Sequence, residues 1–103
     1  EGDVGGVVAN VNRWRNELTL PPVDEAGAHA ALGELKTDDP HTTAYYLDIT
    51  GTDRKTGVEA RMIAAMAPHG GETWFFKMKG APEIVEQEKG AFFKLVQTAR
   101  YHD

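Results

Sequence analysis

Apolar residues recur at spacings of three and four in the first part of the chain, which is the spacing of one face of an α-helix. The pattern extends over residues 4–18, with asparagine, arginine and glutamate at most of the other positions. It predicts an amphipathic helix there, with Asp3 as its N-cap. The helix must end before Pro21 and Pro22, because proline lacks the backbone donor that a helix needs.

Helical spacing returns after the prolines. Asp24 can cap a second, shorter helix that runs through Leu35, although Gly27 and Gly33 weaken it. Residues 36–42 are then expected to form a loop, because this segment contains aspartates and a proline typical of turns.

Alternation of apolar and polar residues follows, which is the period of a half-buried β-strand. Three runs show it, over residues 43–50, 58–67 and 72–79. The last two are separated by Pro68-His69-Gly70-Gly71, so they should form an antiparallel hairpin. The sequence therefore predicts three antiparallel strands.

The hairpin strands carry apolar side chains on both faces. Met62 and Met66 should point to one side of the sheet, and Ile63 and Ala65 to the other. Strands of this kind are usually buried on both sides. We therefore expect helices against both faces of the sheet.

The final helix opens at Gly80-Ala81-Pro82. Proline suits the first helical position, and Glu83 lies in the first turn, where the helix dipole favours negative charge. An apolar stripe at helical spacing then extends to Ala99, consisting of Ile84, Val85, Phe92, Leu95, Val96 and Ala99.

Length and composition fit one domain. The chain has 103 residues, of which 41% are hydrophobic and 26% charged, close to the average for globular proteins. The predicted fold class is α+β, with an antiparallel sheet covered by helices. Because a sheet covered on both faces usually has more than three strands, residues 1–103 are expected to form a single α+β domain or the C-terminal part of a larger one.

Charge and cysteine content exclude several classes of function. The net charge of −5 disfavours nucleic acid as a partner, because the chain offers no overall positive field to a phosphate backbone. The absence of cysteine excludes disulfides, thiolate metal sites and a cysteine nucleophile. No apolar run approaches the ~20 residues of a membrane-spanning helix, and no signal peptide opens the chain.

No assembled catalytic or metal-binding set is evident. The four histidines lie in separate segments without paired metal-ligand spacing, and His69 and His102 are expected to be solvated. His41 and Asp39 resemble part of a catalytic triad, but the neighbouring threonines do not lie in a nucleophile elbow. We predict no catalytic residue, no metal and no cofactor.

The most unusual local composition is in the first helix. Asn10, Asn12, Arg13 and Arg15 surround Trp14, and they are the candidate residues for binding a ligand or partner. The structural alternative is that Trp14 packs in the core while the arginines pair with acidic neighbours such as Glu17.

Three segments resemble a group of uncharacterised bacterial secreted proteins and lipoproteins of planctomycete type. They are Ala9 to Arg15 with Leu20-Pro21-Pro22, Gly71 to Met78 with Gly80, and Val85 with Gln87-Glu88-Lys89 and Phe92-Phe93. The resemblance implies an N-terminal region that holds a lipoprotein signal and further strands, hence an extracytoplasmic location and a lipid anchor. The element order is similar to the Mog1/PsbP class, an α/β/α sandwich. No catalytic residues follow from the resemblance.

The function that these observations favour is a non-enzymatic extracytoplasmic domain that binds an unidentified protein partner or supports an envelope assembly. The alternative is a protein that binds a small anionic molecule, or a hydrolase, with a pocket between the first helix and the sheet and Arg13 or Arg15 as an anion clamp.

Overall fold

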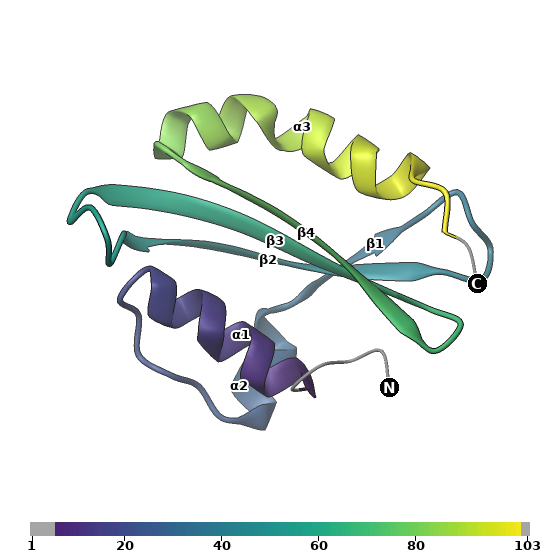
Figure 1. Ribbon diagram of the computed structural model, residues 1–103, viewed down its shortest axis with the longest axis horizontal. Helices are drawn as coiled ribbons and strands as arrows, with labels where there is room; N and C mark the ends of the chain where they lie inside the picture. Colours follow the sequence, from purple (N-terminus) through teal and green to yellow (C-terminus); the bar gives the residue numbers. More distant parts are fainter. Residues whose placement is uncertain (1–5, 102–103) are drawn as a thin grey trace.

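The computed structural model describes residues 6–101, and it has three layers: two helices, an antiparallel sheet and a third helix (Figure 1). Helices α1 and α2 lie on one face of the sheet, and α3 covers the other. In chain order the elements are α1 (Gly6–Glu17), α2 (Glu25–Ala31), β1 (Gly33–Lys36), β2 (Thr43–Thr52), β3 (Glu59–His69), β4 (Glu72–Gly80) and α3 (Pro82–Thr98). The α+β class and the helices on both faces are therefore as the sequence predicts.

The sheet has four strands, not the three that the sequence predicts. They are ordered β1-β2-β3-β4, and each pairs antiparallel with the next. The hairpin between β3 and β4 turns through Gly70 and Gly71 alone, with φ values of 58° and 87°. Because glycine adopts positive φ without steric cost, these two residues can close a two-residue turn.

Strand β1 is the additional strand, and the spacing of the apolar residues around it predicts a helix instead. Leu32 and Leu35 are three residues apart, which suits one face of a helix, whereas in the structure they pack against opposite faces of the sheet. In the structure α2 ends at Ala31, and Gly33 pairs with Tyr46 of β2. A Cβ atom on Gly33 would collide with the Tyr46 ring, so any other residue at this position would require the ring to move. This tertiary contact leaves no mark in the local sequence.

Each face of the sheet packs a core of its own. On the α1 side, Val11, Trp14 and Leu18 pack against Met62 and other inward residues of β2 and β3. On the α3 side, the core consists of Ala44, Ile63, Ala65, Ala67, Val85, Phe92, Val96 and Tyr101. The alternation of β3 thus divides its side chains between the two cores as predicted.

The short helix α2 is capped as predicted, since Asp24 Oδ1 accepts a hydrogen bond of 2.8 Å from the Gly27 amide. The expected cap Asp3, and the predicted start of the first helix at Val4, lie outside the described residues. No helix within residues 6–101 is long and apolar enough to span a membrane.

Candidate functional site

The asparagines of the predicted binding cluster face the protein. Asn10 is completely buried. Asn12 is half-buried, and its amide binds both backbone groups of Val23: Nδ2 donates to the carbonyl at 3.0 Å, and Oδ1 accepts from the N–H at 2.8 Å. Asn12 therefore fastens the segment between α1 and α2 to α1.

The two arginines differ: Arg15 has a structural role, and Arg13 is exposed. Arg15 Nε donates a 2.7 Å hydrogen bond to the carbonyl of Pro21, in the same connecting segment. Arg13 is exposed, with its guanidinium carbon 5.8 Å from the centre of the Trp14 ring. Trp14 belongs to the core, as the structural alternative holds. Arg13 is thus the cluster member whose side chain is most available to a partner.

The expected pairing of these arginines with Glu17 is wrong. Glu17 instead binds two lysines of β4, with Lys77 Nζ at 3.2 Å and Lys79 Nζ at 2.7 Å. The register of β4 places its odd-numbered side chains on the α1 side, where the end of α1 brings Glu17. Strand pairing across the whole molecule decides this contact, so the local helix sequence could not predict it.

A second polar cluster joins the loop before β2 to the β3–β4 hairpin. His69 Nδ1 lies 2.6 Å from Thr42 Oγ1 and 3.4 Å from Asp39 Oδ2, and only 12% of its side chain is exposed. The expectation of a solvated His69 is therefore wrong, whereas His102 lies outside the described residues. The amide of His41 donates to Asp39 and, with Thr42 and His69, lowers the pKa of that carboxyl.

This cluster is not arranged as a catalytic triad. A triad uses one imidazole nitrogen for the carboxylate and the other for the nucleophile, so that the ring can pass a proton between them. Here Asp39 and Thr42 both approach Nδ1 of His69. The arrangement holds the loop to the hairpin. No group of three or more His, Asp or Glu side chains that could hold a metal ion occurs within residues 6–101.

The most distinctive surface feature is the outer edge of β4. This strand of nine residues is last in the sheet, and within residues 6–101 it pairs with β3 alone. The two-residue turn makes His69 and Glu72 a hydrogen-bonded pair, and such pairs alternate along an antiparallel ladder. The backbone groups that point away from β3 are therefore those of Thr73, Phe75, Lys77 and Lys79.

The lysines of β4 do not guard this edge. Edge lysines commonly prevent pairing with another strand by projecting a charge from it. Here Lys79 Nζ lies 2.7 Å from Glu17 and 3.0 Å from Asp53 Oδ2, and Lys77 also binds Glu17. The hydrogen bonds to Glu17 and Asp53 raise the pKa of Lys79. The hydrogen bond from Lys79, and after it the one from Lys77, lowers the pKa of Glu17. The ammonium groups are thus held over the α1 face, where the carboxylates balance their charge.

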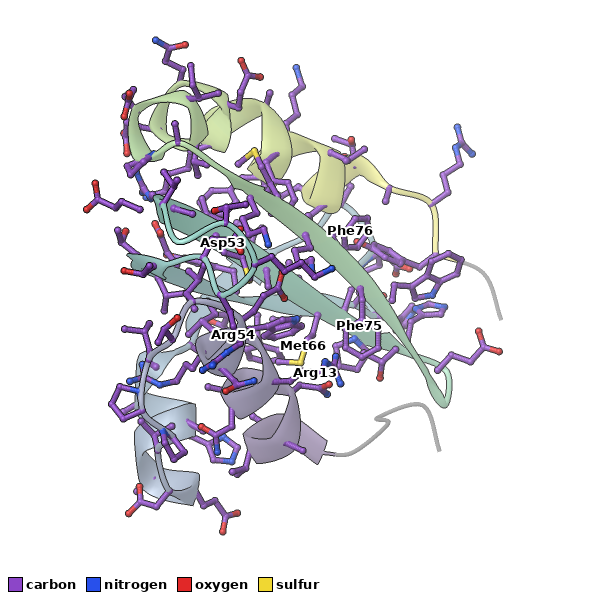
Figure 2. The ribbon with its side chains drawn as sticks, turned by 60° about the vertical axis from the view of Figure 1, so that its left-hand side comes forward. Arg13, Asp53, Arg54, Met66, Phe75 and Phe76 are labelled. Carbon is purple, nitrogen blue, oxygen red and sulfur yellow. The ribbon has the colours of Figure 1, made fainter. Side chains whose placement is uncertain are left out.

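Apolar surface flanks the edge on both sides of the sheet. Trp74 and Phe75 are 37% and 41% exposed, and Phe75 and Phe76 point to opposite sides of β4 (Figure 2). On the α3 side, a shallow groove of about 510 Å³ separates β4 from α3. Met78, Phe92 and the half-exposed Leu95 contribute its apolar lining, and Lys77, Lys79 and Glu88 contribute charged groups.

The sequence predicts β4 as a strand but not its position at the edge. Strand order depends on which strands pair. Strand β3 is interior because it pairs with both β2 and β4, and the additional strand β1 makes β2 interior as well, so that β4 lies at one edge of the sheet. The pair Trp74-Phe75 is a signal in the sequence, but alternation alone assigns both residues to the core.

Comparison of the chain with family models, curated proteins and solved structures found no match.

Proposed function

We propose that this protein is a non-catalytic binding domain that takes up an extended strand of a partner polypeptide along the outer edge of β4. The observation that carries the proposal is the outer edge of β4, which is nine residues long, has no partner strand among residues 6–101 and has the charges of its lysines balanced by acidic side chains. Strand addition of this kind draws affinity from main-chain hydrogen bonds and specificity from pockets for alternate side chains.

The groove on the α3 side defines the chemistry of the partner strand. An added strand would direct every second side chain toward the groove. Apolar side chains fit there against Met78, Phe92 and Leu95, and the charged rim of the groove, which includes Glu88, can accommodate a polar end. On the opposite side it would meet Phe75 and the balanced charges of Glu17, Asp53 and the two lysines. We therefore expect an alternating apolar and polar segment without proline.

The setting of this interaction is also part of the proposal. Its support is the resemblance of the sequence to bacterial secreted proteins and lipoproteins, which favours an extracytoplasmic location, an α/β/α fold of the Mog1/PsbP type and a role in envelope assembly. Strand addition at β4 is a mode of binding that suits such a role, since it needs no catalytic residue and no cofactor.

A pair of variants at one position tests the edge. Phage-displayed random decapeptides would be selected on the immobilised protein, and the enriched peptides synthesised and titrated by fluorescence anisotropy. Lys77→Pro removes an outward N–H but no bond to β3, whereas Lys77→Ala removes the same side chain and keeps that N–H. We expect Lys77→Pro to weaken peptide binding about tenfold or more, the equivalent of ~1.4 kcal/mol, and Lys77→Ala to change it less than about twofold.

Both variants lose the ion pair with Glu17, so their thermal stabilities should be similar, and circular dichroism would check this. Enrichment of no alternating peptide, or equal binding by Lys77→Pro and the wild type, would refute strand addition at β4.

A further inference from the structure

A hollow of about 390 Å³ lies between the helix layer of α1 and α2 and the sheet, on the opposite face from α3. Its floor is formed by Tyr45, Met66 and Thr73, which belong to three adjacent strands. Val7 of α1 and Leu32, directly after α2, line its helix side. Among the described residues, Thr73 is the one lining residue that also belongs to the outer edge of β4; Phe75, Lys77 and Lys79 of that edge do not line the hollow.

The hollow exists because the short helix α2 ends at Ala31, while β3 and β4 continue to the hairpin at Gly70. Sheet residues near the hairpin therefore remain partly uncovered by α1 and α2, and Tyr45 is 37% exposed. Figure 2 shows Met66 and Phe75 on the α1 side of the sheet.

The lining determines which ligand fits. Almost all of it is apolar, and the polar groups are the Tyr45 phenol, the Thr73 hydroxyl and the exposed imidazole of His29. Neither Arg13 nor Arg15 lines it, so the hollow offers no guanidinium clamp for an anion. His29 lies 3.9 Å from Glu25, which further disfavours an incoming negative charge.

The size of the hollow and the types of side chain that line it narrow the class of ligand further. A volume of about 390 Å³ is at the lower end of the range for small-molecule sites, roughly 300–1,000 Å³. Met66 and Tyr45 are neighbours across the strands, and a thioether beside an aromatic ring makes favourable, adaptable contacts with another ring.

We infer that this hollow binds a neutral, mainly apolar molecule of two or three aromatic rings that carries one hydrogen-bonding group. The site is independent of the proposed strand addition. It lies between the helix layer and the sheet, as in the alternative hypothesis of an anion pocket, but it selects against charge.

Two probes of matching shape test the inference. N-phenyl-1-naphthylamine is neutral, and 1-anilinonaphthalene-8-sulfonate adds one sulfonate to the same ring system. We expect the neutral probe to bind with one-to-one stoichiometry, seen as a saturable rise in fluorescence, and the sulfonate to bind about tenfold more weakly or worse. Tighter binding of the sulfonate, or no saturable binding of the neutral probe, would overturn the inference.

Matched variants locate the site. Leu32→Asp places a carboxylate in the hollow, and Ile84→Asp makes the same kind of change on the exposed surface of α3. We expect Leu32→Asp to weaken binding of the neutral probe at least about tenfold and Ile84→Asp to leave it unchanged. If Leu32→Asp fails to fold, Thr73→Arg introduces a charge from the edge strand and should have the same effect. Equal loss in Leu32→Asp and Ile84→Asp would refute this location.

The edge variant keeps the two proposals apart. Lys77→Pro should bind the neutral probe like the wild type, because Lys77 does not line the hollow. Loss of peptide binding with unchanged probe binding is therefore the result expected if both proposals hold, and loss of both in a folded Lys77→Pro protein would contradict the independence of the hollow.

Discussion

Asn12 illustrates how a polar residue that the sequence marks as a candidate binding group is used for folding. Its side-chain amide binds the N–H and the C=O of Val23. It thus satisfies backbone groups that a helix or strand would otherwise satisfy, in a segment that has no regular structure. The sequence shows an unusual concentration of asparagine and arginine, but it cannot show that their partners are main-chain atoms of residues 21–23. That information depends on the path of the chain after α1.

Replacing Asn12 with alanine should therefore lower the stability of the fold. Asn12→Ala leaves the half-buried backbone groups of Val23 without these partners, and we expect a loss of about 1–3 kcal/mol in the free energy of unfolding. Arg13→Ala, on the exposed side of the same helix, should change it by less than about 0.5 kcal/mol. Urea denaturation measures both. Equal effects would show that Asn12 does not fasten the connecting segment.

At the scale of elements, the sequence predicts best where a pattern is long. The helices α1 and α3 and the strands β2, β3 and β4 each extend over nine or more residues, and their periods identify them. Strand β1 has only four residues, and its one leucine, Leu35, continues the spacing of the preceding helix. Gly33 has the character of a weak helix position, whereas in the structure it permits the Tyr46 ring to lie against the backbone.

The hairpin that creates the β4 edge depends on its turn glycines. Gly71 has a φ of 87° and open space where a Cβ atom would lie, so a substitution there is penalised by the backbone alone. We expect Gly71→Ala to destabilise the protein by about 1–2 kcal/mol. Gly70→Asn should be nearly neutral, because Asn-Gly is a preferred pair for turns of this type. Thermal unfolding followed by circular dichroism would distinguish them, and a neutral Gly71→Ala would be inconsistent with the positive φ.

At the scale of the whole molecule, ion pairs tie both helix layers to the sheet. On one face, Glu17 of α1 binds Lys77 and Lys79 of β4. On the other, Arg61 of β3 binds Asp48 at 2.7 Å and Glu86 of α3 at 2.6 Å. The layers themselves could be predicted, because strands with apolar side chains on both faces need helices to bury each face. The ion pairs could not be predicted, since each joins residues that are distant in the sequence.

These ion pairs predict how stability depends on pH. Hydrogen bonds from Arg61 and the charge of Lys89 hold the pKa of Asp48 below its ordinary 3.8, and the lysines hold that of Glu17 below 4.5. In this range the unfolded chain binds more protons than the folded one, so acid favours unfolding. The stabilisation is complete above about pH 4.5 and is lost as the pH falls through the lowered values of the folded state.

Urea unfolding at a series of pH values from 7 to 2 would measure this loss. Asp48→Asn should reduce stability at pH 7 by about 1.5–3 kcal/mol, because it removes a carboxylate that accepts two hydrogen bonds from Arg61. The variant should also lose less stability than the wild type below pH 4, since one titrating group with a lowered pKa is gone. Parallel pH profiles for the two proteins would mean that Asp48 does not contribute to the acid sensitivity.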